Sequence, residues 1–165
     1  MPRMNAYKAI YPGPQRQANA QVLPRTERGA MAYSELTRGT VEEYAAMEST
    51  VMNRVASGMK YWVDPDNRGH ALNEHDVITA PQQYQGVGSQ NYALYRSGYT
   101  DQGARNAAQA DENLRRTGRP TTKAVSFIVH QDGSPPTDHE VMNLGRNLKA
   151  AQPAKVGRVY LYEPK

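Results

Sequence analysis

The sequence predicts a single α+β domain that is mainly helical and carries a small β element near its C-terminal end. Two helices are predicted, over residues 41–56 and 101–116, because each has helical spacing and recognisable end signals. Two segments, 124–130 and 158–163, are rich in β-branched and aromatic residues that alternate as in strands. The length of 165 residues is that of one ordinary domain.

Residues 1–25 predict an extended arm or linker. They hold Pro2, Pro12, Pro14 and Pro24 among polar residues and show no sustained helical or alternating period. The pattern changes at Thr26, so we place the folded domain at residues 26–165.

A short helix is predicted directly after the arm. Ala30, Met31, Tyr33 and Leu36 have helical spacing, and the helix should break near Gly39. Glu35 therefore falls at or near the C-terminal end of this helix.

The helix over 41–56 has the strongest local signals. Thr40 with Glu43 three residues on forms a capping box, and Ser57 with Gly58 should end the helix. The apolar residues at helical spacing are Val41, Tyr44, Ala45, Val51, Met52 and Val55.

The remaining elements follow in order. Residues 59–99 are rich in Gly, Asn, Asp, Gln and Pro, which predicts an irregular segment with a hairpin or short helices. The polar helix over 101–116 has Thr100 as an N-cap candidate and Gly118 as its stop. The two β-like segments are expected to pair with each other.

Composition narrows the classes of function. The net charge of +4 and pI near 9.3 favour polyanionic surroundings. The basic residues are scattered, however, with no run longer than Arg115 and Arg116, which argues against nucleic acid and leaves cell-wall polymer ahead of it. The chain has no cysteine, so disulfides, zinc-thiolate sites and thiol catalysis are excluded. We expect no cofactor and no metal, because His70, His75, His130 and His139 lack compact metal-ligand spacing.

Four glutamates lie between Ser34 and Gly58, and they differ in setting. Glu42 and Glu43 suit the positive end of a helix dipole, so a structural role explains them. Glu48 lies on the apolar stripe of its helix, where a buried carboxylate needs a partner or a raised pKa. Glu35 has apolar and aromatic neighbours that would keep it protonated near neutral pH, as a general acid for a glycosidic bond requires.

The chain resembles the cell-wall hydrolases of the spore cortex-lytic SleB and CwlJ type, whose catalytic domain is lysozyme-like or lytic-transglycosylase-like. The resemblance covers roughly residues 26–164. It rests on five short segments in the family's order: "SELTRG" at 34–39, "VMNRV" at 51–55, "PQQYQGV" at 81–87, "ARNAAQADENLRRTGRPTTKAVSFIV" at 104–129 and "VGRVYLYEP" at 156–164.

The resemblance implies that Glu35 is the catalytic acid. It also implies that Gln83 and Tyr84 line the glycan cleft, and Gln82 and Tyr33 complete the expected substrate-binding set. The family's second acid, four residues past the catalytic one, is Gly39 here. Glu48 is therefore our candidate for a second carboxylate.

The implied activity is cleavage between N-acetylmuramic acid and N-acetylglucosamine in peptidoglycan. One confidently placed acid favours a lytic transglycosylase, whereas a second carboxylate would make the chain a muramidase. A wall-binding or virion module without activity is the non-enzymatic alternative, and a basic nucleic-acid-binding domain is a third.

The sequence also sets expectations about location and partners. No secretory signal or membrane-spanning run is visible, so we expect no membrane insertion. We expect a phage or a secretion system to deliver the protein to the periplasm or cell wall. Peptidoglycan glycan strands are the expected partner, with phage or secretion machinery and an immunity protein as further candidates.

Overall fold

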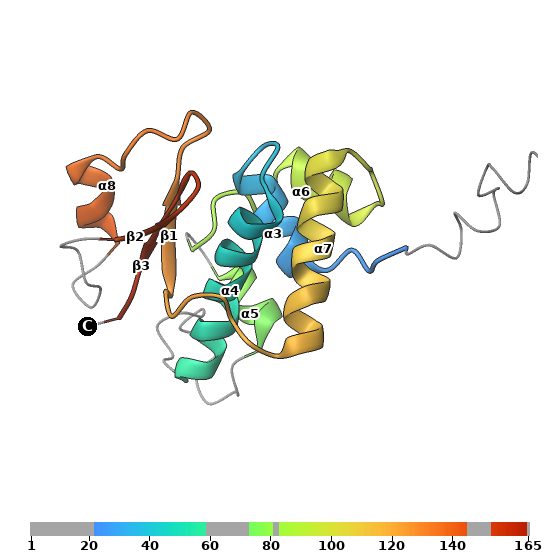
Figure 1. Cartoon of the computed structure of the whole chain (residues 1–165), viewed down its shortest axis with the longest axis horizontal. Coiled ribbons are helices and arrows are strands. Elements are labelled where there is room, and N and C mark those ends of the chain that lie inside the picture. Colours follow the sequence, from blue (N-terminus) through green and yellow to red (C-terminus); the bar gives the residue numbers. More distant parts are fainter. Residues whose placement is uncertain (1–21, 59–72, 81–82, 145–152, 165) are drawn as a thin grey trace, which may run out of the picture.

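The computed structural model describes residues 22–58, 73–80, 83–144 and 153–164. Six helices and a three-stranded antiparallel sheet make up these residues (Figure 1). The helices are α3 (Glu27–Glu35), α4 (Val41–Ser57), α5 (Glu74–Thr79), α6 (Gln90–Arg96), α7 (Gln102–Thr117) and α8 (Asp138–Asn143); the strands are β1 (Ser126–Val129), β2 (Ala154–Val156) and β3 (Val159–Tyr162). The predicted mainly helical α+β class is confirmed.

Helices α3 and α4 begin and end close to where the sequence predicts. The hydroxyl of Thr26 accepts a hydrogen bond from the backbone of Gly29 at the start of α3. The capping box of Thr40 and Glu43 is present at the start of α4, and Gly58 ends that helix in the left-handed conformation with φ 65°. Glu35 is the last residue of α3, so its predicted position is confirmed.

Helix α7 differs from the prediction at its N-terminus. Its N-cap is Asp101, whose carboxylate accepts from the backbone of Ala104, and the predicted Thr100 lies one residue outside. An acid is also the better cap here, because it meets the positive end of the helix dipole. Gly118 ends α7 as predicted, with φ 64°.

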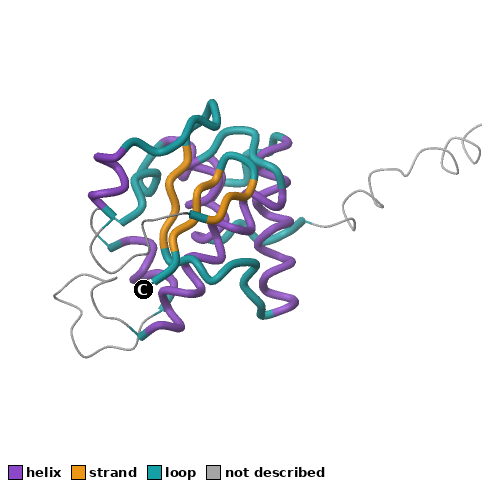
Figure 2. Tube along the Cα trace, turned by 60° about the vertical axis from the view of Figure 1, so that its left-hand side comes forward, coloured by secondary structure: helices purple, strands orange, loops and turns teal. Residues whose placement is uncertain are grey.

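Strands β1 and β3 pair antiparallel, from Ser126 opposite Tyr162 to Val129 opposite Val159, which confirms the predicted pairing. The short β2, which the sequence analysis did not identify, pairs with the other edge of β3. Figure 2 shows the three strands side by side against the helices.

Other elements pack against both faces of the sheet. Phe127, Val129, Val159 and Leu161 pack into the core formed by α3, α4 and α7. On the other face, Ile128, Tyr160 and Tyr162 pack with Val141 and Leu144 at α8. The sheet therefore lies between the main helices and α8 (Figure 1), which brings α8 close to residues much earlier in the chain.

The arm and the irregular segment are described only in part. Leu23 and Arg25, which the sequence analysis assigned to the arm, contact the body: Leu23 packs against the core and Arg25 donates to the carbonyl of Tyr99. Helices α5 and α6 lie in the segment where short helices were one expectation. Of the helices described, none is long and apolar enough to cross a membrane.

Candidate active site

A pocket of about 270 Å³ lies between the helices and the sheet. One group of lining residues comes from α3, α4 and the loop before α6, and the other comes from β1 and α8. The lining residues are Glu35, Arg54, Gln83, Tyr84, Gln85, Ser126, Phe127, Ile128, Val129, Glu140, Asn143 and Leu144. Carboxylates, amides, a guanidinium and aromatic rings are the groups that bind sugar hydroxyls and ring faces.

Glu35 is positioned from three sides. It ends α3, and the backbone N–H of Gly86 donates to its Oε1 over 2.7 Å. The side chain of Gln131 then fixes the turn that follows, because its Oε1 accepts from the backbone of Thr37 and its Nε2 donates to the backbone carbonyl of Glu35.

The pKa of Glu35 is raised. Burial is the main cause, because it disfavours the charged carboxylate, while the backbone N–H groups of Gly86 and Gln85 act in the opposite direction. The carboxyl group therefore holds its proton to higher pH than a solvated glutamate, and one of its oxygens is fixed by a donor.

Arg54 connects the two sides of the pocket. Its guanidinium lies over the ring of Tyr84, with 4.5 Å between the guanidinium carbon and the ring centroid. It also donates to the Oε1 of Gln83 and to the hydroxyl of Ser126. Arg54 is only 4% exposed, so it holds the loop residues and β1 rather than reaching into solvent.

Tyr84 forms a rigid part of the lining. It is buried, its hydroxyl is 3.1 Å from that of Thr50 on α4, and its ring lies 6.0 Å from that of Phe127 on β1. Gln83 and Tyr84 are thus brought together with Glu35, whereas Gln82 lies outside the described residues.

Tyr33 lies away from this pocket. Its hydroxyl donates to Asp101 over 2.8 Å, and its ring packs against that of Tyr95. Tyr33 is absent from the residues that line the pocket, so the structure places it in the helical core rather than beside Glu35.

Glu48 is fully buried in the same core and is likewise absent from the pocket lining. Neither of its carboxylate oxygens has a hydrogen-bond partner among the described residues. Burial, together with the charge of Asp111, raises the pKa of Glu48 well above its ordinary value, although Arg28 opposes this shift. Burial therefore favours the protonated, neutral form of this carboxyl group.

The sequence analysis did not identify Glu140 as a pocket residue. It lies on α8, whose capping box joins it to Thr137, and its Oε2 is 2.8 Å from the Nε2 of His130. The Thr-x-x-Glu spacing is a sequence signal for this helix start, but only packing against the sheet places Glu140 near Glu35.

No metal-binding cluster is present in the part of the chain that the structure describes. No group of three or more His, Asp or Glu side chains is arranged there to hold an ion. Glu35, whose pKa is raised, is the carboxyl group in the pocket that is suited to give a proton.

Comparisons with protein-family models, with curated proteins and with solved structures found no match to this chain.

Proposed function

We propose that the protein cleaves the glycan strands of peptidoglycan between N-acetylmuramic acid and N-acetylglucosamine, with Glu35 as the general acid. One observation carries the proposal: a half-buried carboxyl group with a raised pKa lines a polar pocket and is held in place by a backbone N–H. The arrangement of α3 and α4 beside a small sheet supports a lysozyme-like architecture.

The proposed reaction starts with proton transfer. Glu35 gives its proton to the glycosidic oxygen, and the bond between that oxygen and the muramic C1 breaks. Glu35, now a carboxylate, takes the proton of the muramic C6 hydroxyl as that oxygen bonds to C1. The products are a free N-acetylglucosamine hydroxyl and a 1,6-anhydromuramic end, which is lytic transglycosylation.

Two observations support this one-acid route. Glu48, the sequence candidate for a second carboxylate, does not line the pocket. Among the described residues that line the pocket, Glu35 is the only acid on the helical side. Hydrolysis by a muramidase is the second candidate, because Glu140 lines the same pocket from the other side.

Location and partners remain part of the proposal. The chain's net charge of +4 favours an anionic wall polymer. We propose action in the periplasm or on the cell wall after delivery by a phage or a secretion system. If a secretion system delivers the protein as an antibacterial toxin, an immunity protein would be a further partner.

The first test is digestion of purified peptidoglycan by the wild-type protein, Glu35→Gln and Glu42→Gln, with released muropeptides identified by mass spectrometry. Glutamine keeps an oxygen for the Gly86 N–H but has no proton to give, so we expect a loss of about 100- to 10,000-fold. Glu42 is exposed on the first turn of α4, and its variant should retain activity.

The products separate the candidates. Anhydromuramic ends that depend on Glu35 support transglycosylation, and reducing muramic ends support hydrolysis. Release that is equal for the wild type and Glu35→Gln would contradict the assigned acid. No release from several wall types would favour a binding or virion module, and strong salt-dependent retention on DNA would favour nucleic acid.

A further inference from the structure

The pocket holds a second carboxylate whose orientation is fixed. Glu140 reaches the pocket from α8, on the far side of the sheet from Glu35. Its Oε1 accepts from the backbone N–H of Thr137 over 2.9 Å, and its Oε2 lies 2.8 Å from the Nε2 of His130. Each oxygen still has a lone pair available for a ligand.

His130 is itself held in one orientation. Its Nδ1 lies 2.9 Å from the backbone oxygen of Ser134, so both ring nitrogens face acceptors. The bond to Glu140 is the main cause of a raised pKa for His130. A protonated ring satisfies both contacts, since both nitrogens then donate.

We infer that Glu140, oriented by His130, is the anion that stabilises positive charge on the sugar ring while Glu35 protonates the glycosidic oxygen. This inference rests on the proposed function. Glycoside cleavage passes through a transition state with oxocarbenium character, and a preorganised anion near the ring lowers its energy.

The same contacts argue against a proton-transfer role for Glu140. The Thr137 backbone N–H and then His130 lower the pKa of Glu140 to about 2, so it remains ionised and weakly basic. The pKa of Glu35, in contrast, lies above the ordinary value of a glutamate. The two carboxyl groups thus divide the work, with Glu35 exchanging the proton and Glu140 supplying fixed charge.

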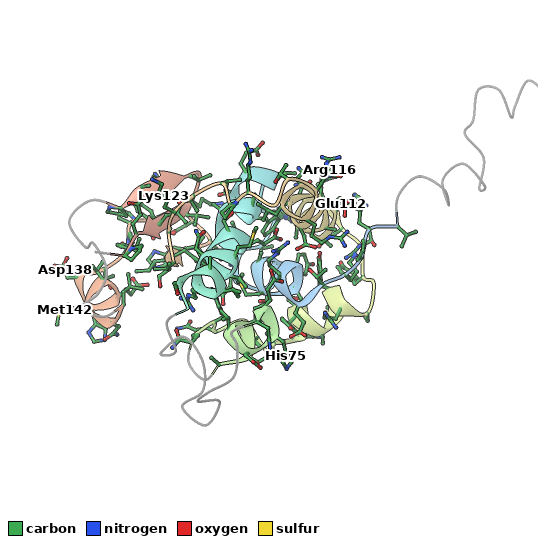
Figure 3. All side chains as sticks on the ribbon, turned by 90° about the horizontal axis from the view of Figure 1, so that it is seen from below. His75, Glu112, Arg116, Lys123, Asp138 and Met142 are labelled. Atoms are coloured by element: carbon green, nitrogen blue, oxygen red, sulfur yellow. The ribbon has the colours of Figure 1, made fainter. Side chains whose placement is uncertain are left out.

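Glu140→Gln isolates this charge. Glutamine is accepted at the same capping-box position, so its oxygen can still receive the Thr137 N–H and α8 should form. Asp138→Asn is the matched control, because Asp138 is an exposed acid on the same helix that does not line the pocket. Figure 3 shows Asp138 at the outer side of α8, away from the main helices.

Two ligands that need no turnover report on the charge. We would titrate each variant with a cationic iminosugar of N-acetylglucosamine configuration and with neutral triacetylchitotriose. We expect Glu140→Gln to bind the iminosugar about tenfold more weakly and the trisaccharide unchanged. Asp138→Asn should bind both as the wild type does.

Turnover gives the second readout. On peptidoglycan, Glu140→Gln should lose about 10- to 100-fold in kcat with little change in KM, since the charge acts in the transition state. If the wild type cleaves and Glu35→Gln does not, but Glu140→Gln equals Asp138→Asn in both assays, this inference falls and the proposed function stands. If the wild type neither binds nor cleaves, both fall.

His130→Ala tests the orienting role. Loss of its bond should raise the pKa of Glu140 above about 2 and move the acidic limb of the rate profile to higher pH. Two other ionisable groups interact electrostatically with this pair: Asp132 with His130, and Tyr162 on β3 with Glu140. An acidic limb that does not move would contradict the orienting role.

Discussion

The pKa of each buried carboxyl group in this protein depends on the groups that surround it. Glu43 and Glu48 lie on the same helix and are both buried. Burial alone would raise the pKa of Glu43, but hydrogen bonds from Arg158 and Thr40 hold it below the ordinary value. Glu48 has no such hydrogen-bond partner among the described residues, and its pKa is raised.

Glu48 should therefore make the protein less stable as pH rises. Its folded-state pKa lies above the unfolded value of about 4.5, so the folded state keeps a proton that the unfolded state releases. The contribution of Glu48 to stability is full below pH 4.5 and falls by up to about 1.4 kcal/mol per pH unit until the folded pKa is reached.

Glu48→Gln removes this titration while keeping the side-chain volume. We expect the free energy of unfolding of Glu48→Gln, measured with urea from pH 4.5 to 8, to increase relative to that of the wild type as pH rises. Glu42→Gln, at an exposed position, should follow the wild type. A difference between Glu48→Gln and the wild type that stays constant with pH would show that Glu48 is ionised in the folded state.

At the scale of elements, the loop before α6 determines how Glu35 is held. Gly86 lies so close to α3 that a Cβ there would be 2.0 Å from the hydroxyl oxygen of Ser34 and 2.8 Å from its Cβ. Only glycine lets the loop approach closely enough for its N–H to reach Glu35.

Gly86→Ala should move this loop away from α3 and weaken its bond to Glu35. Because that bond lowers the pKa of Glu35, its loss should raise the pKa further. Glu35 acts when protonated, so the alkaline limb of the rate profile should move to higher pH, with activity falling about 10- to 100-fold from misplacement.

The pKa change can be followed without turnover, by NMR titration of the Glu35 carboxyl carbon. Ser34→Ala is the control, because it shortens the side chain at the contact and leaves the loop in place. An unchanged Glu35 titration in Gly86→Ala would mean that the loop does not set the proton affinity of the acid.

At the scale of the whole molecule, Arg158 joins the sheet to the helices. It lies in the turn between β2 and β3, and its backbone N–H and side chain both donate to the Oε2 of Glu43 at the start of α4. Its guanidinium also donates to backbone carbonyls of Thr37, Arg38 and Gln131. The turn after Glu35 and the sheet are therefore held in one network.

Arg158→Ala should cost about 2 to 4 kcal/mol of unfolding free energy, because it leaves Glu43 buried without its cation. The side chain of Glu43 is only 5% exposed, against 27% for Arg158. The lowered pKa of Glu43 means that this contribution is present above pH 4.5 and is lost as pH falls through the folded value.

Chemical denaturation at pH 7 and at pH 3 measures both effects. Arg115→Ala is the comparison, because Arg115 pairs with acids on its own helix and is 45% exposed, so it should cost less than about 1 kcal/mol. Equal losses for the two arginine variants would contradict a joining role for Arg158.

Much of the local structure followed from the sequence. The helix around Met31, the capping box of Thr40 and Glu43, the stops at Gly58 and Gly118, and the pairing of β1 with β3 are written in spacings of a few residues, where local sterics and hydrogen bonds decide the outcome. The position of Glu35 at a helix end and the burial of Glu48 followed for the same reason.

Tertiary structure alone decided what surrounds these residues. Glu35 is held by Gly86, 51 positions later, and shares its pocket with Glu140, which reaches it only because the sheet packs between α8 and the main helices. Tyr33, expected beside the sugar, instead bonds to Asp101 in the core. Periodicity reports which face of an element is apolar, but not which distant element covers that face, and the pocket is made of such distant contacts.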